Sequence, residues 1–190
     1  MSFVDTIVGH PRIYNLLMDV AGRHAVLRPI QPWLDQLTGR VIDVGGGTGR
    51  IREKLRTDVR FSCLDVDLRK LRYSTGAVAA DATALPFADS SIDGALLIGV
   101  THHLNEAVVH GVVAELARVL GSRGQLIVLD AVSVAAPNLT SRALWWMDRG
   151  HHPHTTHDLE TALRQRFDIQ DTSTYTVLHH YAAWRCIGRS

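Results

Sequence analysis

The sequence predicts an α/β fold, in which helices cover a mostly parallel β-sheet. Runs of residues with helical spacing alternate with short, apolar, strand-like runs along most of the chain. This alternation is typical of parallel strands joined by right-handed crossovers. Residues 92–100 are apolar on both faces, as a central strand of such a sheet should be. The last two strand-like runs have no helix between them, so we expect the chain to end in an antiparallel pair of strands.

The elements can be placed in order along the chain. Residues 10–37 carry two helical patterns, and Pro29 and Pro32 start or interrupt the second of them. A long helix is expected over about residues 105–120, because its apolar residues fall on one face. The other predicted helices are 48–56 and 158–166, and the predicted strands are 40–44, 60–66, 77–80, 92–100, 125–132, 167–177 and 178–189.

The composition is that of an ordinary globular protein. The chain has 190 residues, of which 46% are hydrophobic and 21% charged, so we expect one domain with one substantial core. The formal net charge of +1 gives no electrostatic reason to expect a nucleic-acid partner. Neither Cys63 nor Cys186 belongs to a CxxC pair, which argues against a structural zinc site or a disulfide framework.

The sequence also bears on location. The first residues show no basic stretch followed by an apolar one, so we expect no signal peptide. No apolar run reaches the roughly 18 residues of a membrane span. We therefore expect a cytoplasmic protein that exists as a monomer or a homodimer.

The most informative stretch is residues 40–49, where a strand-like run and an acid lead into four glycines within five positions. Such a turn brings backbone N–H groups and a helix N-terminus close to a ligand. A phosphate loop would need a lysine that is absent here, and a dinucleotide turn would need glycine where Arg50 stands. The pattern Asp/Glu-x-Gly-x-Gly-x-Gly is filled at every position by Asp43, Gly45, Gly47 and Gly49.

Companion motifs follow the glycine turn in a consistent order. Asp65 ends the second predicted strand, and Asp81-Ala82 ends the third. With these motifs the chain resembles the class I S-adenosylmethionine-dependent methyltransferases over about residues 40–133. A dinucleotide-binding fold would explain only the glycine turn and Asp65. The further matches are Leu85-Pro86-Phe87 with Ser91-Ile92-Asp93, and Arg118-Val119-Leu120-Gly121-Ser122-Arg123-Gly124, in which Ser122 and Arg123 depart from the family's pattern.

The resemblance implies a Rossmann-like, three-layer sandwich with a seven-stranded, mostly parallel sheet. The implied strand order is 3-2-1-4-5-7-6, with an antiparallel last strand, which agrees with the final strand pair expected from the sequence pattern. We expect one methyltransferase domain over residues 1–190. Its parts would be N-terminal helices (1–38), a donor-binding core (39–133), a lid-like insertion (134–157) and a final helix and strand pair (158–190).

The resemblance also implies a site for S-adenosylmethionine. Asp65 would accept hydrogen bonds from ribose hydroxyls, and Asp81 with the N–H of Ala82 would hold the adenine. Asp43 would orient the donor's ammonium group. Tyr14 is a candidate for closing over the methionine end, although packing on the core explains it as well. The full set of expected cofactor-binding residues is Tyr14, Asp43, Gly45, Gly46, Gly47, Gly49, Asp65, Val66, Asp67, Asp81, Ala82 and Gly99.

Candidate catalytic residues follow the fourth and fifth predicted strands. An acceptor that loses a proton as it attacks would need a general base, and ligands of such sheets bind at the carboxyl ends of the strands. His103 is the first candidate, and a histidine that shapes the donor pocket is the alternative. His102 is a second candidate, for which a structural role is the better explanation. Asp130 could hydrogen-bond an acceptor or a histidine.

The acceptor is expected to be a small molecule. Trp33, Trp145, Trp146 and the apolar first helix favour an apolar, aromatic or lipid-like one. The histidine-rich run 151–157 lacks the spacing of metal ligands, so we expect no metal there, and a substrate lid or a solvated loop explains it better. The alternative function is a regulatory or partner-binding protein that binds S-adenosylmethionine without transferring methyl groups.

Overall fold

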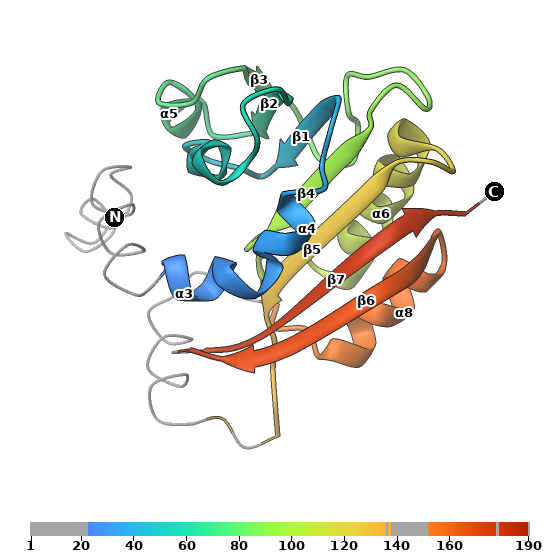
Figure 1. Cartoon of the computed structure of the whole chain (residues 1–190). Helices are drawn as coiled ribbons and strands as arrows, with labels where there is room; N and C mark the ends of the chain where they lie inside the picture. The colour runs from blue at the N-terminus through green and yellow to red at the C-terminus, as the bar shows by residue number, and fades with distance from the viewer. Residues whose placement is uncertain (1–22, 136, 138–151, 178, 190) are drawn as a thin grey trace.

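The structure, a computed structural model, describes residues 23–135, 137, 152–177 and 179–189. Figure 1 shows these residues folded into three layers, with one sheet between two sets of helices. The strands are β1 (Arg40–Val44), β2 (Arg60–Asp65), β3 (Ala77–Ala79), β4 (Gly94–Ile98), β5 (Gln125–Ala131), β6 (Phe167–Thr176) and β7 (His180–Gly188).

The seven strands form one sheet in the order β3-β2-β1-β4-β5-β7-β6. Neighbouring strands from β3 to β5 are parallel, whereas β7 runs antiparallel to both β5 and β6. The predicted strand order and the antiparallel seventh strand are therefore confirmed.

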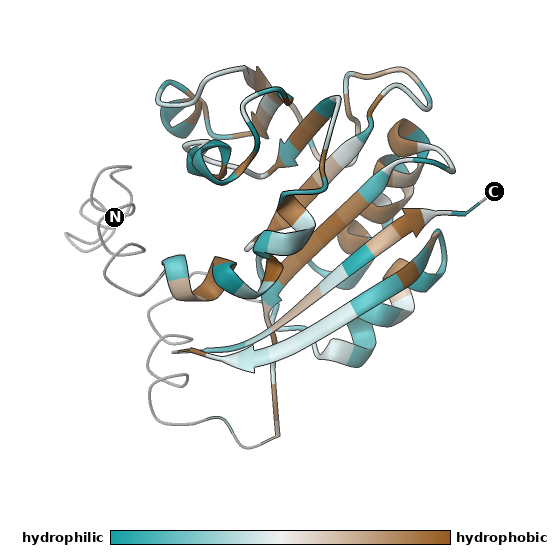
Figure 2. Ribbon diagram, in the orientation of Figure 1, coloured by the Kyte–Doolittle hydropathy of each residue, from teal (hydrophilic) through white to brown (hydrophobic). Residues whose placement is uncertain are grey.

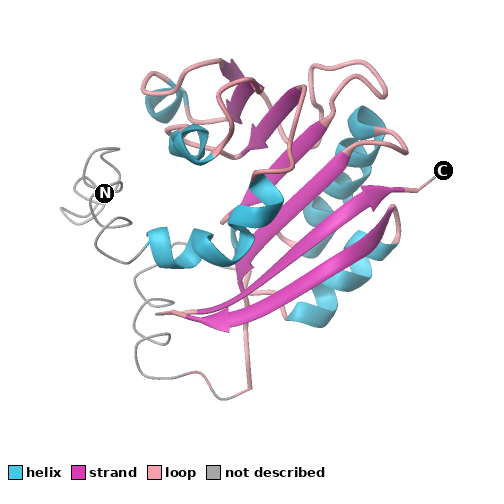
Figure 3. Cartoon of the chain, in the orientation of Figure 1, coloured by secondary structure: helices cyan, strands magenta, loops and turns pink. Residues whose placement is uncertain are grey.

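Helices cover both faces of this sheet, as Figure 3 shows. On one face lie α3 (Arg23–Leu27), the 3₁₀ helix η1 (Arg28–Ile30) and α4 (Gln31–Leu34). The other face is covered by α6 (Glu106–Leu120) and α8 (Thr156–Arg164). The remaining helical turns are η2 (Arg50–Lys54), α5 (Leu68–Leu71) and η3 (Thr101–His103).

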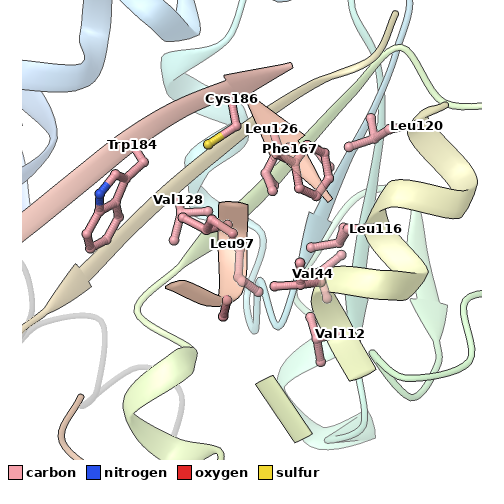
Figure 4. Packing of buried hydrophobic residues seen from close by; sticks show 14 of the residues in the cluster. Val44, Leu97, Val112, Leu116, Leu120, Leu126, Val128, Phe167, Trp184 and Cys186 are labelled. Atoms are coloured by element: carbon pink, nitrogen blue, oxygen red, sulfur yellow. The ribbon is translucent and has the colours of Figure 1, made fainter. Parts of the chain in front are cut away.

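The core consists of two clusters, because successive side chains of a strand point to opposite faces. In β5, Leu126 and Val128 join the cluster beneath α6 and α8, whereas Ile127 and Leu129 join the cluster beneath α3 and α4. Figure 2 shows the central strands as strongly hydrophobic and the edge strand β6 as more polar. Figure 4 shows the first cluster, in which Trp184 of β7 is fully buried.

Arg118 explains two of the motifs that the resemblance was based on. Its guanidinium donates to the backbone oxygens of Leu85 (3.1 Å) and Phe87 (2.8 Å), and to the carboxylate of Glu115 (2.7 and 2.8 Å). Glu115 in turn accepts the N–H of Leu85 at 2.7 Å. The hydrogen bond from Arg118 holds the pKa of Glu115 below its ordinary value, so this carboxylate stays charged. The pair fixes the loop that leads into β4.

Three local predictions need correction. The helix expected over 48–56 is only the 3₁₀ turn η2, which begins after Gly49 in a left-handed conformation and ends where Leu55 becomes extended. The strand expected over 92–100 ends at Ile98, because Gly99 has a positive φ of 66°. Helix α5 was not predicted, since a segment of four residues is too short to show helical periodicity.

Removing the cap of α8 should destabilise the protein by about 1 kcal/mol. The side chain of Thr155 accepts the N–H of Asp158 at 3.2 Å, and the Asp158 carboxylate accepts the N–H of Thr155 at 2.8 Å. Thr155→Ala removes the first of these bonds, and urea unfolding would measure the loss. Thr161→Ala, at an exposed position within the same helix, is the control. An equal loss for both variants would contradict the role of the cap.

Candidate functional site

The expected ligand residues lie at one edge of the sheet. Strands β1, β2, β4 and β5 are parallel, so their carboxyl ends meet at the same edge. The glycine turn follows β1, Asp65 ends β2, Gly99 follows β4 and Asp130 lies near the end of β5. In α/β sheets this edge is where ligands bind.

The glycine turn is packed so closely at Gly46 that a side chain would not fit there. A Cβ built on Gly46 would lie 2.1 Å from Oδ2 of Asp43 and 2.8 Å from Sγ of Cys63. The N–H of Gly46 donates to the backbone oxygen of Leu64 at 3.0 Å, which ties the turn to β2. Burial raises the pKa of the Cys63 thiol to about 11, so Cys63 is a neutral packing residue beneath the turn.

Asp65 is held against this turn. Asp65 is only 8% exposed. Its Oδ2 accepts the N–H of Gly47 at 3.0 Å. Its other oxygen, Oδ1, accepts the N–H of Asp67 at 2.8 Å. A carboxylate oxygen can accept more than one hydrogen bond. The carboxylate is therefore fixed in orientation and keeps acceptor capacity beside the turn.

The two residues after Asp65 have different surroundings. Val66 is 74% exposed, which is unusual for a large apolar side chain directly after a buried strand. Asp67 caps α5, because its carboxylate accepts the N–H of Arg69 at 2.9 Å and pairs with the Arg69 guanidinium. The hydrogen bond from Arg69 also lowers the pKa of Asp67. Asp67 thus has a structural role that its position in the sequence did not reveal.

Asp81 lies in the loop after β3 and is exposed. Its Oδ1 accepts both the N–H and the hydroxyl of Thr83, at 2.8 and 2.7 Å. These bonds lower the pKa of Asp81, so the group is a carboxylate at neutral pH. Neither bond uses Oδ2. Ala82 is half-buried and packs against the main core cluster.

Asp130 is the most enclosed charged group of the site, at 1% exposure. Its Oδ2 accepts the N–H and the hydroxyl of Thr101, both at 2.6 Å, and its Oδ1 accepts the N–H of Ala131 at 2.7 Å and contacts Nδ1 of His102 at 2.5 Å. Burial acts to raise the pKa of Asp130, but the attraction to His102 and the hydrogen bonds outweigh it and hold the pKa below its ordinary value. Asp130 is therefore a buried anion.

The two histidines of η3 differ in exposure. His102 is buried and His103 is exposed, and their rings lie 4.1 Å apart between centroids. Residues 152–155 run alongside this turn. The N–H of His152 donates to the backbone oxygen of His102 at 3.1 Å, and Nε2 of His154 donates to that of Leu104 at 2.8 Å. The end of the expected insertion is thus fixed to the turn that carries both histidines.

Residues 42–128 match the model of a protein family described as a methyltransferase domain. Over this stretch the chain is similar to a methyltransferase domain. The match covers the glycine turn, Asp65, Asp81 and both histidines of η3, and it confirms the resemblance found in the sequence. It leaves the final helix and strand pair outside.

About half of the chain is similar in sequence to a named methyltransferase. A demethylmenaquinone methyltransferase of Renibacterium salmoninarum is 34% identical over 99 residues, which are 48% of this chain and 40% of that protein. The chain therefore aligns with less than half of the length of this relative.

Solved structures share the fold. The PH0226 protein from Pyrococcus horikoshii has a TM-score of 0.70 at 15% identity, over 88% of this chain and 90% of that one. A geranyl diphosphate C-methyltransferase from Streptomyces coelicolor, solved with S-adenosyl-L-homocysteine, has a TM-score of 0.69 at 12% identity, over 90% and 83%. The [4+2]-cyclase SpnF has a TM-score of 0.67 at 16% identity, over 93% and 81%. At such identities the likeness concerns the fold alone.

Several residues that the sequence analysis singled out lie outside the described part of the chain, namely Tyr14, Trp145, Trp146 and His151. Within the described part, no group of three or more His, Cys, Asp or Glu side chains is arranged to hold a metal ion. None of the helices described there has the length and apolar character needed to cross a membrane. At Gly99, a Cβ would meet no described atom within 4 Å, so this position of the sheet edge is open.

The sequence pattern did not indicate that Lys70 lies near the glycine turn. A Cβ built on Gly47 would lie 3.5 Å from Cδ of Lys70 and 3.8 Å from Oδ2 of Asp65. The aliphatic part of Lys70 therefore lies over the glycine turn, beside the Asp65 carboxylate. The position of Lys70 on α5 could have indicated this only if the helix itself had been predicted.

Proposed function

We propose that this protein is an S-adenosylmethionine-dependent methyltransferase that acts on a small acceptor. The observation that carries the proposal is the contact between Asp65 and the glycine turn, in which a buried carboxylate accepts the N–H of Gly47 at 3.0 Å. This contact brings a polar anchor and a turn without side chains together at the ligand-binding edge of the sheet. The family match of residues 42–128 supports the same function.

The residues present fit this donor. Asp65 keeps acceptor capacity for ribose hydroxyls, and the exposed Val66 beside it offers an apolar surface to a purine ring. Oδ2 of Asp81 would accept the exocyclic amine of the adenine. At Gly46, only a residue without a side chain lets the backbone lie this close to Asp43. The turn held in this way would meet the methionine part of the donor.

The bound donor would supply a methyl group already activated by the sulfonium. The chain must then mainly align the nucleophile, the methyl carbon and the sulfur for an in-line displacement. Such alignment is worth about 7–11 kcal/mol in well-oriented systems. The edge formed by the glycine turn, Gly99 and η3 would provide this alignment, because these segments follow β1 and β4, which are adjacent and parallel.

An apolar or aromatic acceptor fits the remaining observations. The formal net charge is only +1, which gives no broad electrostatic attraction for nucleic acid. The partial relative is a demethylmenaquinone methyltransferase, and a structural neighbour methylates geranyl diphosphate. Both names describe small molecules with large apolar parts.

A binding protein without transferase activity is the alternative. The structural neighbour SpnF is a [4+2]-cyclase, so this fold also occurs in a protein whose stated reaction is not methyl transfer. The donor-site residues would look the same in a protein that binds S-adenosylmethionine for regulation.

Two measurements test the proposal. Calorimetry should show binding of S-adenosylmethionine and of S-adenosylhomocysteine; binding of NAD alone would overturn the assignment of the donor. The second experiment supplies methyl-labelled donor together with one of three sources of acceptor: reduced demethylmenaquinone, geranyl diphosphate or a cell extract. Label should appear in a small-molecule fraction. Tight donor binding without label in any fraction would favour the binding protein instead.

A further inference from the structure

The two edges of the sheet differ in length and protection. One edge is β3, with three residues, whereas the other is β6, with ten. Figures 1 and 3 show β6 along the outer margin of the sheet. An edge strand presents unpaired backbone groups to other chains, and proteins limit this with short edge strands or with lysine and proline on the edge. Strand β3 is short, but β6 contains neither lysine nor proline, so β6 is the unprotected edge.

The hydrogen bonds of the β6–β7 hairpin show which backbone groups of β6 point outward. The N–H of Val177 donates to the backbone oxygen of His179 at 3.1 Å, so the backbone of Val177 faces the returning strand. In an antiparallel pair, residues whose backbone groups face the partner strand alternate with residues whose groups face away from it. The N–H and C=O groups of Thr172, Thr174 and Thr176 therefore point away from β7.

The bonds of β7 lead to the same assignment. The backbone oxygen of His180 accepts the N–H of Val132 at 2.9 Å, so the backbone of His180 faces the β5 side and not Thr176, its partner in β6. Thr172, Thr174 and Thr176 are all exposed. Within the part of the chain that the structure describes, no backbone hydrogen bond reaches their outward groups. A further strand could therefore pair with this half of β6.

This outward stretch is suited to pairing with a copy of itself. Thr174 lies midway between Thr172 and Thr176. In a twofold antiparallel pair centred on Thr174, Thr172 of each copy would lie opposite Thr176 of the other. Each pair of opposite residues would exchange two backbone hydrogen bonds. Thr–Thr pairs across neighbouring strands are also favourable, so the same register satisfies both backbone and side chains.

Electrostatic repulsion does not oppose this arrangement. Residues 172–176 carry no charge. Asp171 accepts from Nε of Arg185 at 2.7 Å, and Asp168 accepts from Nε of Arg189 at 2.7 Å, so both acids of β6 are paired within the chain. A β-bulge immediately before Asp171 separates Asp168 from the threonine stretch. The formal net charge of +1 adds little repulsion between two copies.

We propose that residues 172–176 of β6 pair antiparallel with the same residues of a second copy, which joins the two sheets of a homodimer into one. A peptide ligand fits this edge less well, because recognition of an added strand needs pockets for its side chains. The large apolar side chains exposed among the described residues are Val66, Leu68 and Tyr73, and none of them lies on β6. A strand pair of this length is a small interface, so the dimer is weak and concentration-dependent. The proposal does not depend on the methyltransferase function.

Light scattering tests the dimer. The wild type should give the 21.0 kDa of one chain at low concentration and approach twice this mass at about 1 mM. Thr174→Lys should raise the dissociation constant of the dimer about tenfold or more, because it places like charges opposite each other at the twofold axis. Thr57→Lys adds the same charge at an exposed position before β2 and should leave the dimer unchanged. A wild type that stays monomeric, or a Thr174→Lys variant that dimerises as the wild type does, would overturn the proposal.

Amide hydrogen exchange of the wild type tests the same contact without a substitution. The N–H groups of Thr172, Thr174 and Thr176 should exchange more slowly as the protein concentration rises, because their acceptors belong to the second copy. The N–H groups of Ser173 and Tyr175, which face β7, are the control and should be protected at every concentration. If the three threonine amides exchanged at the same rate at all concentrations, the edge would be either unpaired or covered by another segment of the same chain, and the proposal would be wrong.

Discussion

Replacing Trp184 with alanine should lower the free energy of unfolding by about 3–5 kcal/mol. Trp184 is fully buried and lies in β7, between β5 and β6. Its ring packs within the main cluster, near Val128 and Cys186, as Figure 4 shows. Its indole N–H donates to the Glu160 carboxylate at 3.1 Å. The substitution would remove the largest fully buried side chain among the described residues. It would leave a cavity that the paired strands on either side of β7 cannot move to fill.

Two further variants separate the contributions to this loss. Trp184→Phe keeps an aromatic ring but loses the hydrogen bond to Glu160, so a loss of about 1–2 kcal/mol is expected. Trp33→Ala deletes the same side chain from a half-buried position on α4, where the cost should be smaller. Urea unfolding of the three variants gives the comparison. Equal losses for Trp184→Ala and Trp33→Ala would contradict the central place of Trp184 in the core.

The strands could be predicted because their signals are local. The glycine turn ends β1 at the expected residue, and the apolar residues of β4 and β5 face both helical layers, as their composition indicated. The turn η2 was mistaken for a full helix because its apolar residues Ile51 and Leu55 have helical spacing. Spacing shows which side chains face the core, but it does not distinguish one turn of 3₁₀ helix from two turns of α-helix.

The site was predicted less completely, because its contacts join distant segments. The sequence could place Asp65, since it follows a strand next to the glycine turn. It could not show that Asp67 caps a helix or that Lys70 lies over Gly47. It also could not show that His102, rather than His103, contacts Asp130, which is 28 residues away. The two residues come together because β4 pairs with β5, with Ile98 opposite Leu129.

Asp65→Ala should weaken binding of S-adenosylmethionine by about 1–3 kcal/mol. Under the proposed function Asp65 accepts hydrogen bonds from the ribose hydroxyls, and its loss would leave these groups half-buried without a partner. The N–H of Gly47 would also lose its acceptor, so the glycine turn would be held less firmly. Both effects act on the bound state, and calorimetry of the variant would measure their sum.

Two substitutions distinguish a ribose contact from a loss of local order. Asp65→Asn keeps the size of the side chain and one oxygen that can accept the N–H of Gly47, but its NH₂ group cannot accept the N–H of Asp67. It should keep the contact with the turn while weakening the ribose contact. Asp67→Asn changes a nearby carboxylate whose hydrogen bonds cap α5; it should leave donor affinity almost unchanged.

If Asp65→Asn and Asp65→Ala both bound the donor as tightly as the wild type, the ribose would have to lie elsewhere on the sheet edge. If Asp67→Asn weakened binding as much as Asp65→Ala, the order of α5 rather than a carboxylate contact would determine affinity, because α5 also carries Lys70 over the glycine turn.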